Sequence, residues 1–259
     1  MDLLQLTWGT LILRPYVFIF LACYLALAIL HLGLGRALAF LVLGYLVAWT
    51  VEFSSIHTGF PFGLYIYIPA TEDRELWIAG VPFMDSLSYV FLAYAGFTMA
   101  LPALGRSGQG GRFHPEDEKS LWNSWRVAVL GAVLTMTLDI VIDPVALRGY
   151  RWFLGQIYGY PEYGVYFGVP LTNFAGWFLV AFVLLILLQV LNTRLPASGW
   201  WTRGRRRFAG QAFLGPALYL GILAFNLFMT FWIGEYTLGW VGVFIYAPFL
   251  TWLALKTLP

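Results

Sequence analysis

Seven apolar stretches of about 20 residues recur along the chain, and they restrict the fold more than any other feature. In lipid, every backbone polar group needs an internal hydrogen bond, so such stretches span a membrane as α-helices. The composition agrees, because 60% of the residues are hydrophobic and only 11% are charged. We therefore predict an all-α integral membrane protein, a bundle of about seven helices forming a single transmembrane domain over residues 1–259. The predicted spans are residues 15–33, 37–56, 81–104, 126–142, 173–191, 212–233 and 238–256.

The basic residues are distributed unequally between the two sides that these spans create. Eleven fall on one side and four on the other, and the positive-inside rule assigns the richer side to the cytoplasm. We therefore expect the N-terminus outside and the C-terminus inside, in the plasma membrane. The eleven are Arg36, Arg106, Arg112, Lys119, Arg126, Arg194, Arg203, Arg205, Arg206, Arg207 and Lys256, and the four are Arg14, Arg74, Arg148 and Arg151. The run from Arg203 to Arg207 is explained by this topology, so no nucleic-acid partner is expected.

Two carboxylates, Asp139 and Asp143, interrupt the apolar run LTMTLDIVIDP. They are four residues apart, so on a helix they share one face and can meet the same substrate, metal ion or proton. An ionisable side chain inside a span is costly and indicates a functional site by default. Glu52, Asp85 and Glu235 are expected at the same depth, toward the outer leaflet.

The segment EFSSIHTGFPFGLYIY, which begins at Glu52, is a second candidate site. Its glycines and proline prevent an ordinary helix, whereas it is too aromatic for a solvated loop. We predict a re-entrant or interfacial loop after the second span, and an aromatic belt at the headgroups is the alternative. Its candidate substrate-binding residues are His57, Phe60, Phe62, Tyr65 and Tyr67.

A tyrosine-rich loop over residues 148–166 leads into VPLTNFAGW, where Asn173 opens the fifth span. Pro170 and a cap at Thr172 are enough to explain the start of this helix. Asn173 could equally offer its amide to a ligand at the outer end of the bundle, and Trp177 follows one turn later.

These segments together resemble the membrane-bound carotenoid biosynthesis family. The resemblance covers GFPFGLYIY, VPFMDSLSYVFLAYAG, DIVIDPVA and VPLTNFAGW in this order, from Glu52 to Trp177. Characterised members are carotenoid 1,2-hydratases that act on gamma-carotene-type or bacterioruberin-type precursors. The resemblance implies a cofactor-independent hydro-lyase that adds water to the terminal C1=C2 bond of an acyclic psi end group and gives a tertiary alcohol. Before the middle of the third span, where the family pattern usually has a tryptophan or another aromatic residue, this chain has Asp85-Ser86-Leu87-Ser88. Asp85 is also a candidate for substrate binding.

Such an alkene has no leaving group and no acidic proton, so its hydration starts with protonation of the less substituted carbon. Burial and a second carboxylate nearby both favour retention of a proton on one aspartic acid. We expect one of Asp139 and Asp143 to be the acid, while the other stays ionised, orients a water and stabilises the cation. Glu52 is a third catalytic candidate, as a water-positioning base or as the partner of His57. Aromatic faces can also stabilise a cation.

An arginine at the aspartate pair would defeat the acid role, because it favours the ionised carboxylate. Arg148 and Arg151 are near enough in sequence to take that place.

Two other classes of protein stay open. A DxxxD pair also resembles the Mg²⁺ and diphosphate site of intramembrane prenyltransferases, although the nearest second acidic motif, Glu72-Asp73-Arg74-Glu75, lies in a loop. A non-enzymatic carotenoid-binding or transport protein would use the same aromatic groove. No metal or cofactor is expected for hydration, and the partners are a carotenoid, water and the lipid bilayer.

Overall fold

The computed structural model describes residues 2–105, 120–196 and 211–257. Within these ranges, seven helices are long and apolar enough to cross a membrane, which confirms the predicted fold class. Every predicted boundary lies within four residues of the observed one. The seven are α2 (Pro15–Leu32), α3 (Leu34–Thr58), α4 (Phe83–Leu104), α6 (Trp125–Ala146), α7 (Leu171–Arg194), α8 (Gln211–Trp232) and α9 (Tyr236–Thr257). The basic residues Arg106, Arg112, Lys119, Arg203, Arg205, Arg206 and Arg207 lie outside the described residues.

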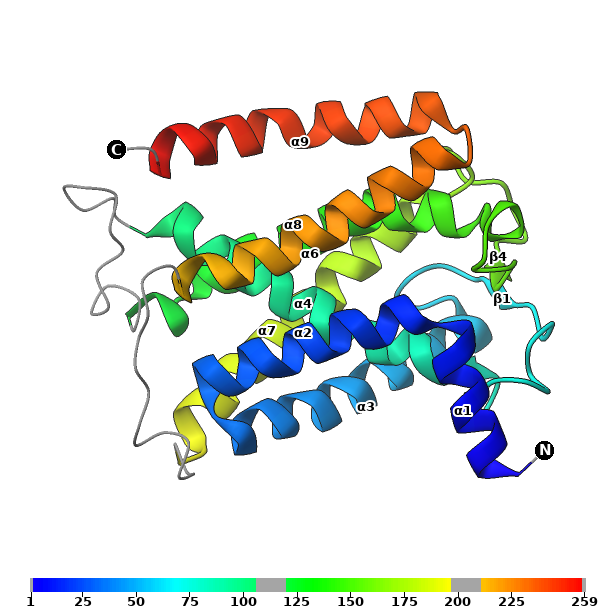
Figure 1. The fold of residues 1–259 in the computed structure, drawn as a ribbon, viewed down its shortest axis with the longest axis horizontal. Helices are drawn as coiled ribbons and strands as arrows, with labels where there is room; N and C mark the ends of the chain where they lie inside the picture. Colours follow the sequence, from blue (N-terminus) through cyan, green and yellow to red (C-terminus); the bar gives the residue numbers. More distant parts are fainter. Residues whose placement is uncertain (1, 106–119, 197–210, 258–259) are drawn as a thin grey trace.

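A shorter helix, α1 (Leu3–Leu13), precedes the bundle at the end that carries the N-terminus (Figure 1). Asp2 caps it, because its side chain accepts a hydrogen bond from the Gln5 backbone while the Gln5 side chain accepts one from Asp2. The helix ends at Arg14, and Pro15 begins α2, where a missing backbone N–H costs nothing. Arg14 therefore lies at the junction of two helices.

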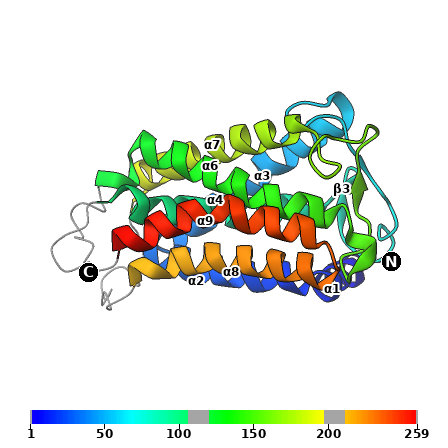
Figure 2. The ribbon, with the colours of Figure 1, turned by 90° about the horizontal axis from the view of Figure 1, so that it is seen from above.

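Helix α4 lies in the middle of the bundle in both views (Figures 1 and 2) and is buried along almost its whole length. Its close packing on α6 depends on two glycines. A Cβ atom on Gly96 would lie 2.2 Å from Thr135 Oγ1, and one on Gly131 would lie 3.1 Å from the Cα atom of Phe97 on α4. Small residues of this kind let membrane helices approach closely. The face of α6 that carries Asp139 is thereby held against the bundle interior.

Two loops cover the end of the bundle beside α1, and short strands join them (Figure 1). The strand β1 (Ile66–Tyr67) pairs antiparallel with β4 (Tyr158–Gly159), so Tyr67 lies opposite Tyr158. A second pair is formed by β2 (Trp77–Ile78) and β3 (Val81–Pro82). The remaining element of this end is the 3-10 helix η1 (Gly149–Arg151). The pairing of β1 with β4 brings together two loops that are about 90 residues apart in sequence.

The loop after α3 folds back onto the bundle, as predicted. Gly59 ends α3 in the left-handed conformation with φ of 79°, and Phe62 then packs against α7, where a Cβ on Gly176 would lie 2.6 Å from its ring. Phe62 is buried whereas Phe60 is exposed, so the aromatic residues of this loop divide between the interior and the surface. Helix α7 begins at Leu171 with Pro170 as its N-cap, and the predicted cap at Thr172 is wrong.

Candidate functional site

A cavity of about 140 Å³ lies under the two loops. Helices α2, α3, α4, α6, α7 and α8 all contribute to its walls, which are mostly apolar and aromatic. Five charged or amide side chains, predicted separately along the sequence, meet on this one cavity: Glu52, Asp85, Asp139, Asp143 and Asn173. Four carboxylates in one apolar cavity are expensive to keep ionised, so their hydrogen-bond partners decide what each can do.

Asp139 and Asp143 are joined by the side chain of Asn173. The Asn173 Nδ2 atom lies 2.7 Å from Asp139 Oδ2 and 3.0 Å from Asp143 Oδ2. An amide nitrogen carries two protons, so it can donate one to each carboxylate. All three side chains are buried. The two carboxylates are therefore held side by side by one donor, in the arrangement that lets a pair share a proton.

The two aspartates differ in their other contacts. Asp143 also accepts hydrogen bonds from the hydroxyls of Tyr158 and Tyr160, the second at 2.8 Å. The Oδ1 atom of Asp139 is buried and has no hydrogen-bond partner among the described residues. Asp143 is thus surrounded by three donors, whereas one oxygen of Asp139 is left for a ligand in the cavity that Asp139 lines.

Glu52 and Asp85 form a second acidic pair on α3 and α4. The Ser86 hydroxyl donates to Glu52 Oε2, and Tyr67 lines the same cavity as Glu52 and Asp85. The predicted pairing of Glu52 with His57 is wrong, because His57 is exposed and its Nδ1 contacts the Phe53 carbonyl at 2.7 Å. Helix α3 ends at Thr58, one residue after His57. The His57 ring is exposed and points away from the cavity.

Four tyrosines form a cluster of rings on the wall of the cavity: Tyr65, Tyr67, Tyr158 and Tyr160. The Tyr65 ring centroid is 5.2 Å from that of Tyr67 and 6.0 Å from that of Tyr158. Burial and the charges of Glu52, Asp85 and Asp143 raise the pKa of Tyr65 well above its usual value. Burial and the Asp143 charge also raise the pKa values of Tyr158 and Tyr160. These phenols therefore stay neutral and act as hydrogen-bond donors.

Sequence reasoning assigned no role to Tyr158 and Tyr160. A signal was present, because the two alternate along an extended segment and so point to the same side of the chain. Their target, Asp143, could not be recognised without the pairing of β1 with β4.

The aromatic wall of the cavity includes a stacked pair from α4 and α7. The Tyr89 and Trp177 rings stack at 3.9 Å with an interplanar angle of 16°, and the Phe62 ring centroid is 5.7 Å from that of Tyr89. Four of the candidate substrate-binding residues line the cavity: Phe62, Tyr65, Tyr67 and Trp177. The structure does not bring His57 or Phe60 there, since both are exposed. Tyr89 was not anticipated.

The arginines near the site contact a different acid. Arg148 Nε lies 3.1 Å from Glu235 Oε1, and Arg151 also pairs with Glu235. Arg148 donates in addition to the Pro144 carbonyl at 2.8 Å. Within the described residues, no arginine forms an ion pair with Asp139 or Asp143. The arginine that would defeat the acid role is therefore not found there. Glu235, which was expected at the same depth as the other acids, forms ion pairs with these two arginines.

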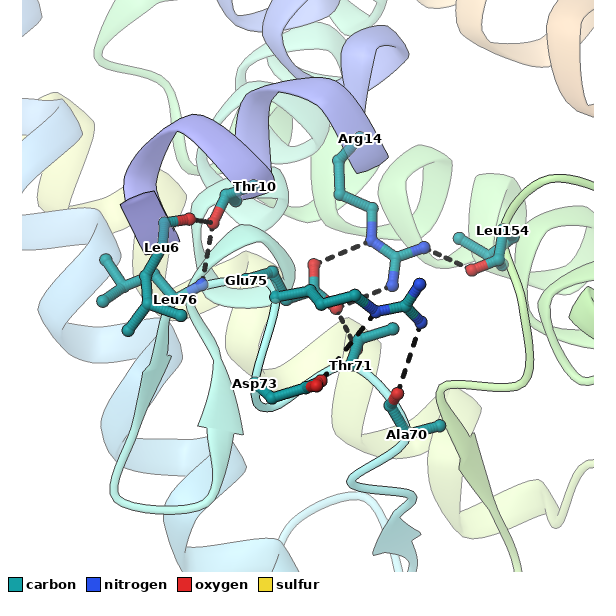
Figure 3. A network of polar contacts seen from close by, with 10 residues as sticks. Leu6, Thr10, Arg14, Ala70, Thr71, Asp73, Glu75, Leu76 and Leu154 are labelled. Carbon is teal, nitrogen blue, oxygen red and sulfur yellow. Dashed lines mark hydrogen bonds and ion pairs between the residues drawn. The ribbon is translucent and has the colours of Figure 1, made fainter. Parts of the chain in front are cut away.

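A buried ion pair fastens the loops beside the cavity (Figure 3). Arg14 and Glu75 form two parallel hydrogen bonds, Nε to Oε2 at 2.9 Å and Nη2 to Oε1 at 2.8 Å. Arg14 also donates to the carbonyl of Leu154, whose side chain lines the cavity. In the sequence, Glu75 belongs to the acidic motif Glu72-Asp73-Arg74-Glu75, the nearest candidate for a second Mg²⁺ site. Its partner is instead an arginine, and Glu72 and Asp73 are exposed.

The fold and the cavity define a helical membrane protein with a buried acidic site at one end of its bundle. Comparison of sequences then gives the family: the chain belongs to the carotenoid biosynthesis protein family, whose model matches residues 13–248. The chain is also similar to bisanhydrobacterioruberin hydratase of Haloarcula japonica, with 27% identity over 192 residues. The matched region covers 73% of this chain and 55% of that relative, so the chain spans just over half of its length. No solved structure matches the chain.

Proposed function

We propose that the protein is a carotenoid hydratase that adds water to the terminal C1=C2 double bond of an acyclic end group and gives a tertiary alcohol. The observation that carries this proposal is the pair Asp139 and Asp143, joined by Asn173 inside an aromatic cavity. The family and the hydratase relative support the same chemistry.

In this reaction the alkene π electrons form a C–H bond with the acid proton at the less substituted carbon. The positive charge then falls on the tertiary carbon, where a lone pair of a water oxygen forms the C–O bond. One water proton leaves to a carboxylate, so atoms and charge balance over the turnover. The stacked rings of Tyr89 and Trp177 would stabilise the cation by their faces.

Asp139 is the better proton donor of the pair. Asp139 lines the cavity, and its Oδ1 atom has no hydrogen-bond partner in the part of the chain that the structure describes, whereas the oxygens of Asp143 accept from Tyr158, Tyr160 and Asn173. Several donors favour the ionised form of a carboxylate. We assign the proton to Asp139 and the negative charge, which stabilises the developing cation, to Asp143.

The size of the cavity fits an end group and not a whole carotenoid. Its volume of about 140 Å³ is smaller than the roughly 300–1,000 Å³ of pockets that enclose a drug-sized ligand. The polyene would then extend from the cavity into lipid. We also propose one transmembrane domain in the plasma membrane with the N-terminus outside, which follows from the basic residues, and a reaction that needs no cofactor.

Expression of the chain in cells that accumulate lycopene tests the proposal. The wild type should give pigment heavier by one water per reacted end, measured by mass spectrometry. Asp139→Asn and Asp143→Asn should lower the yield of this product roughly a hundredfold or more, while the exposed Asp73→Asn should leave it unchanged. A wild type that retains the pigment without ever hydrating it would instead indicate a binding or transport protein.

A further inference from the structure

The cavity contains more acidic groups than protonation of an alkene requires. Asp139 and Asp143 supply a proton and a counter-charge, yet Glu52 and Asp85 line the same cavity from α3 and α4. Glu52 is buried, and the hydroxyl of Ser86 donates to it. A buried carboxylate is costly, so this second pair calls for an explanation of its own.

Tyr67 limits how the second pair can be satisfied. Tyr67 lines the cavity together with Glu52 and Asp85, and a neutral phenol has only one proton to donate, so it cannot satisfy both carboxylates at once. Burial and the Glu52 charge raise the pKa of Tyr67 well above its usual value. Ser86 donates to one oxygen of Glu52, so the four carboxylate oxygens of the pair outnumber the two protons that Ser86 and Tyr67 can donate. A water molecule in the cavity is the small donor that fits there.

We infer that Glu52 and Asp85 hold the water that captures the cation, while Asp139 delivers the proton. This division of labour rests on the proposed hydratase function. It makes Asp85 a further catalytic residue, and it makes Tyr67 and Ser86 positioning residues. Hydration needs an acid for the alkene and a base for the water, and two separate carboxylate pairs supply one each.

The step balances as follows. Asp139 loses its proton to the less substituted alkene carbon, the water oxygen bonds to the tertiary carbon, and the water gives one proton to the Glu52 and Asp85 pair. The enzyme has then lost one proton and gained one. Return of that proton to Asp139 restores the starting state, and the neutral phenols Tyr65 and Tyr67, which line the same cavity, are the groups that would carry it.

The test separates proton delivery from water capture. Purified protein in lipid vesicles loaded with lycopene is incubated in D₂O, and both the alcohol and the recovered alkene are analysed by mass spectrometry. In Glu52→Gln and Asp85→Asn, the alcohol should fall roughly a hundredfold or more, but the recovered lycopene should contain deuterium. A cation that is not captured loses a proton again and keeps the deuterium that it received. Asp139→Asn should give neither alcohol nor deuterated lycopene.

Matched controls are the exposed acids of the outer loop, Glu72→Gln and Asp73→Asn, which should behave as the wild type. Ser86→Ala, which removes only one donor to Glu52, should lower the alcohol yield and retain deuterium uptake. If a variant elutes as a folded species in detergent, its lower alcohol yield reflects a slower reaction and not a failure to fold. Wild-type hydration by Glu52→Gln and Asp85→Asn, or loss of deuterium uptake together with hydration, overturns the inference alone. A wild type without hydrated product overturns the proposed function as well.

Discussion

Asp143 illustrates how single residues control the site. Its carboxylate accepts from two tyrosines and one asparagine, and the tyrosines come from a loop that the pairing of β1 with β4 helps to hold in place. A hydrogen bond to a charged group contributes about 1.5–3 kcal/mol. These three donors therefore favour the ionised form of Asp143. Asn173 also donates to Asp139.

Removal of one of these donors should slow the reaction. We expect Tyr160→Phe to lower the hydration rate roughly tenfold to hundredfold, because Asp143 loses a donor that helps keep it ionised. The measurement is the initial rate of alcohol formation in lipid vesicles. Tyr166→Phe is the control, since the Tyr166 hydroxyl is buried and has no hydrogen-bond partner among the described residues. Equal rates for the two variants would contradict the role given to Tyr160.

At the scale of elements, the distance between α4 and α6 determines how the two acidic pairs face each other. Gly96 and Gly131 lie where the helices touch, with no room for a methyl group on either. Asp85 and Asp139 are carried by these same two helices. A change in their spacing should therefore affect both stability and chemistry.

The glycine contact predicts the effect of one methyl group. Gly96→Ala places a Cβ atom 2.6 Å from the backbone oxygen of Gly131, which cannot move aside as a flexible side chain would. We expect a loss of about 1–3 kcal/mol of stability, the usual cost of overpacking, and a lower hydration rate. Thermal unfolding in detergent measures the first. Gly221→Ala on α8 is the control, because no atom of the described neighbours lies within 4 Å of its added Cβ, and a similar loss there would exclude packing as the cause.

At the scale of the whole molecule, the Arg14 and Glu75 pair connects the start of the bundle to both loops above the cavity. Both side chains are almost completely buried. A buried ion pair adds little net stability to the folded state, but removal of one partner leaves a buried charge without compensation and is strongly destabilising. This ion pair therefore keeps the loop end of the bundle closed over the site.

Loss of Arg14 should accordingly be severe. We expect Arg14→Met to destabilise the protein by about 3–5 kcal/mol, observed as a lower unfolding temperature in detergent. Addition of Glu75→Gln to this variant should recover part of the loss, because the buried charge is then gone. Arg74→Met, which breaks the exposed pair with Asp73, should have little effect. Failure of Glu75→Gln to recover any stability would argue against the ion pair as the cause.

The sequence by itself determined the spans and pointed to the acids within them. Apolar stretches of span length must be helices in lipid, so the seven helices follow from local composition. Asp139, Asp143 and Glu52 could be recognised because a carboxylate is rare and costly inside a span. The resemblance to the carotenoid biosynthesis family followed from short motifs and was confirmed over most of the chain.

Only the tertiary structure decided which partner each acid has. The Asn173 amide, Tyr158 and Tyr160 reach the aspartates through helix packing and the pairing of β1 with β4, and His57, although near Glu52 in sequence, points outward. The physical reason is that burial of an apolar stretch depends on composition, which is local. A hydrogen bond depends on the direction and distance of two groups, and here those groups come from elements far apart in the chain.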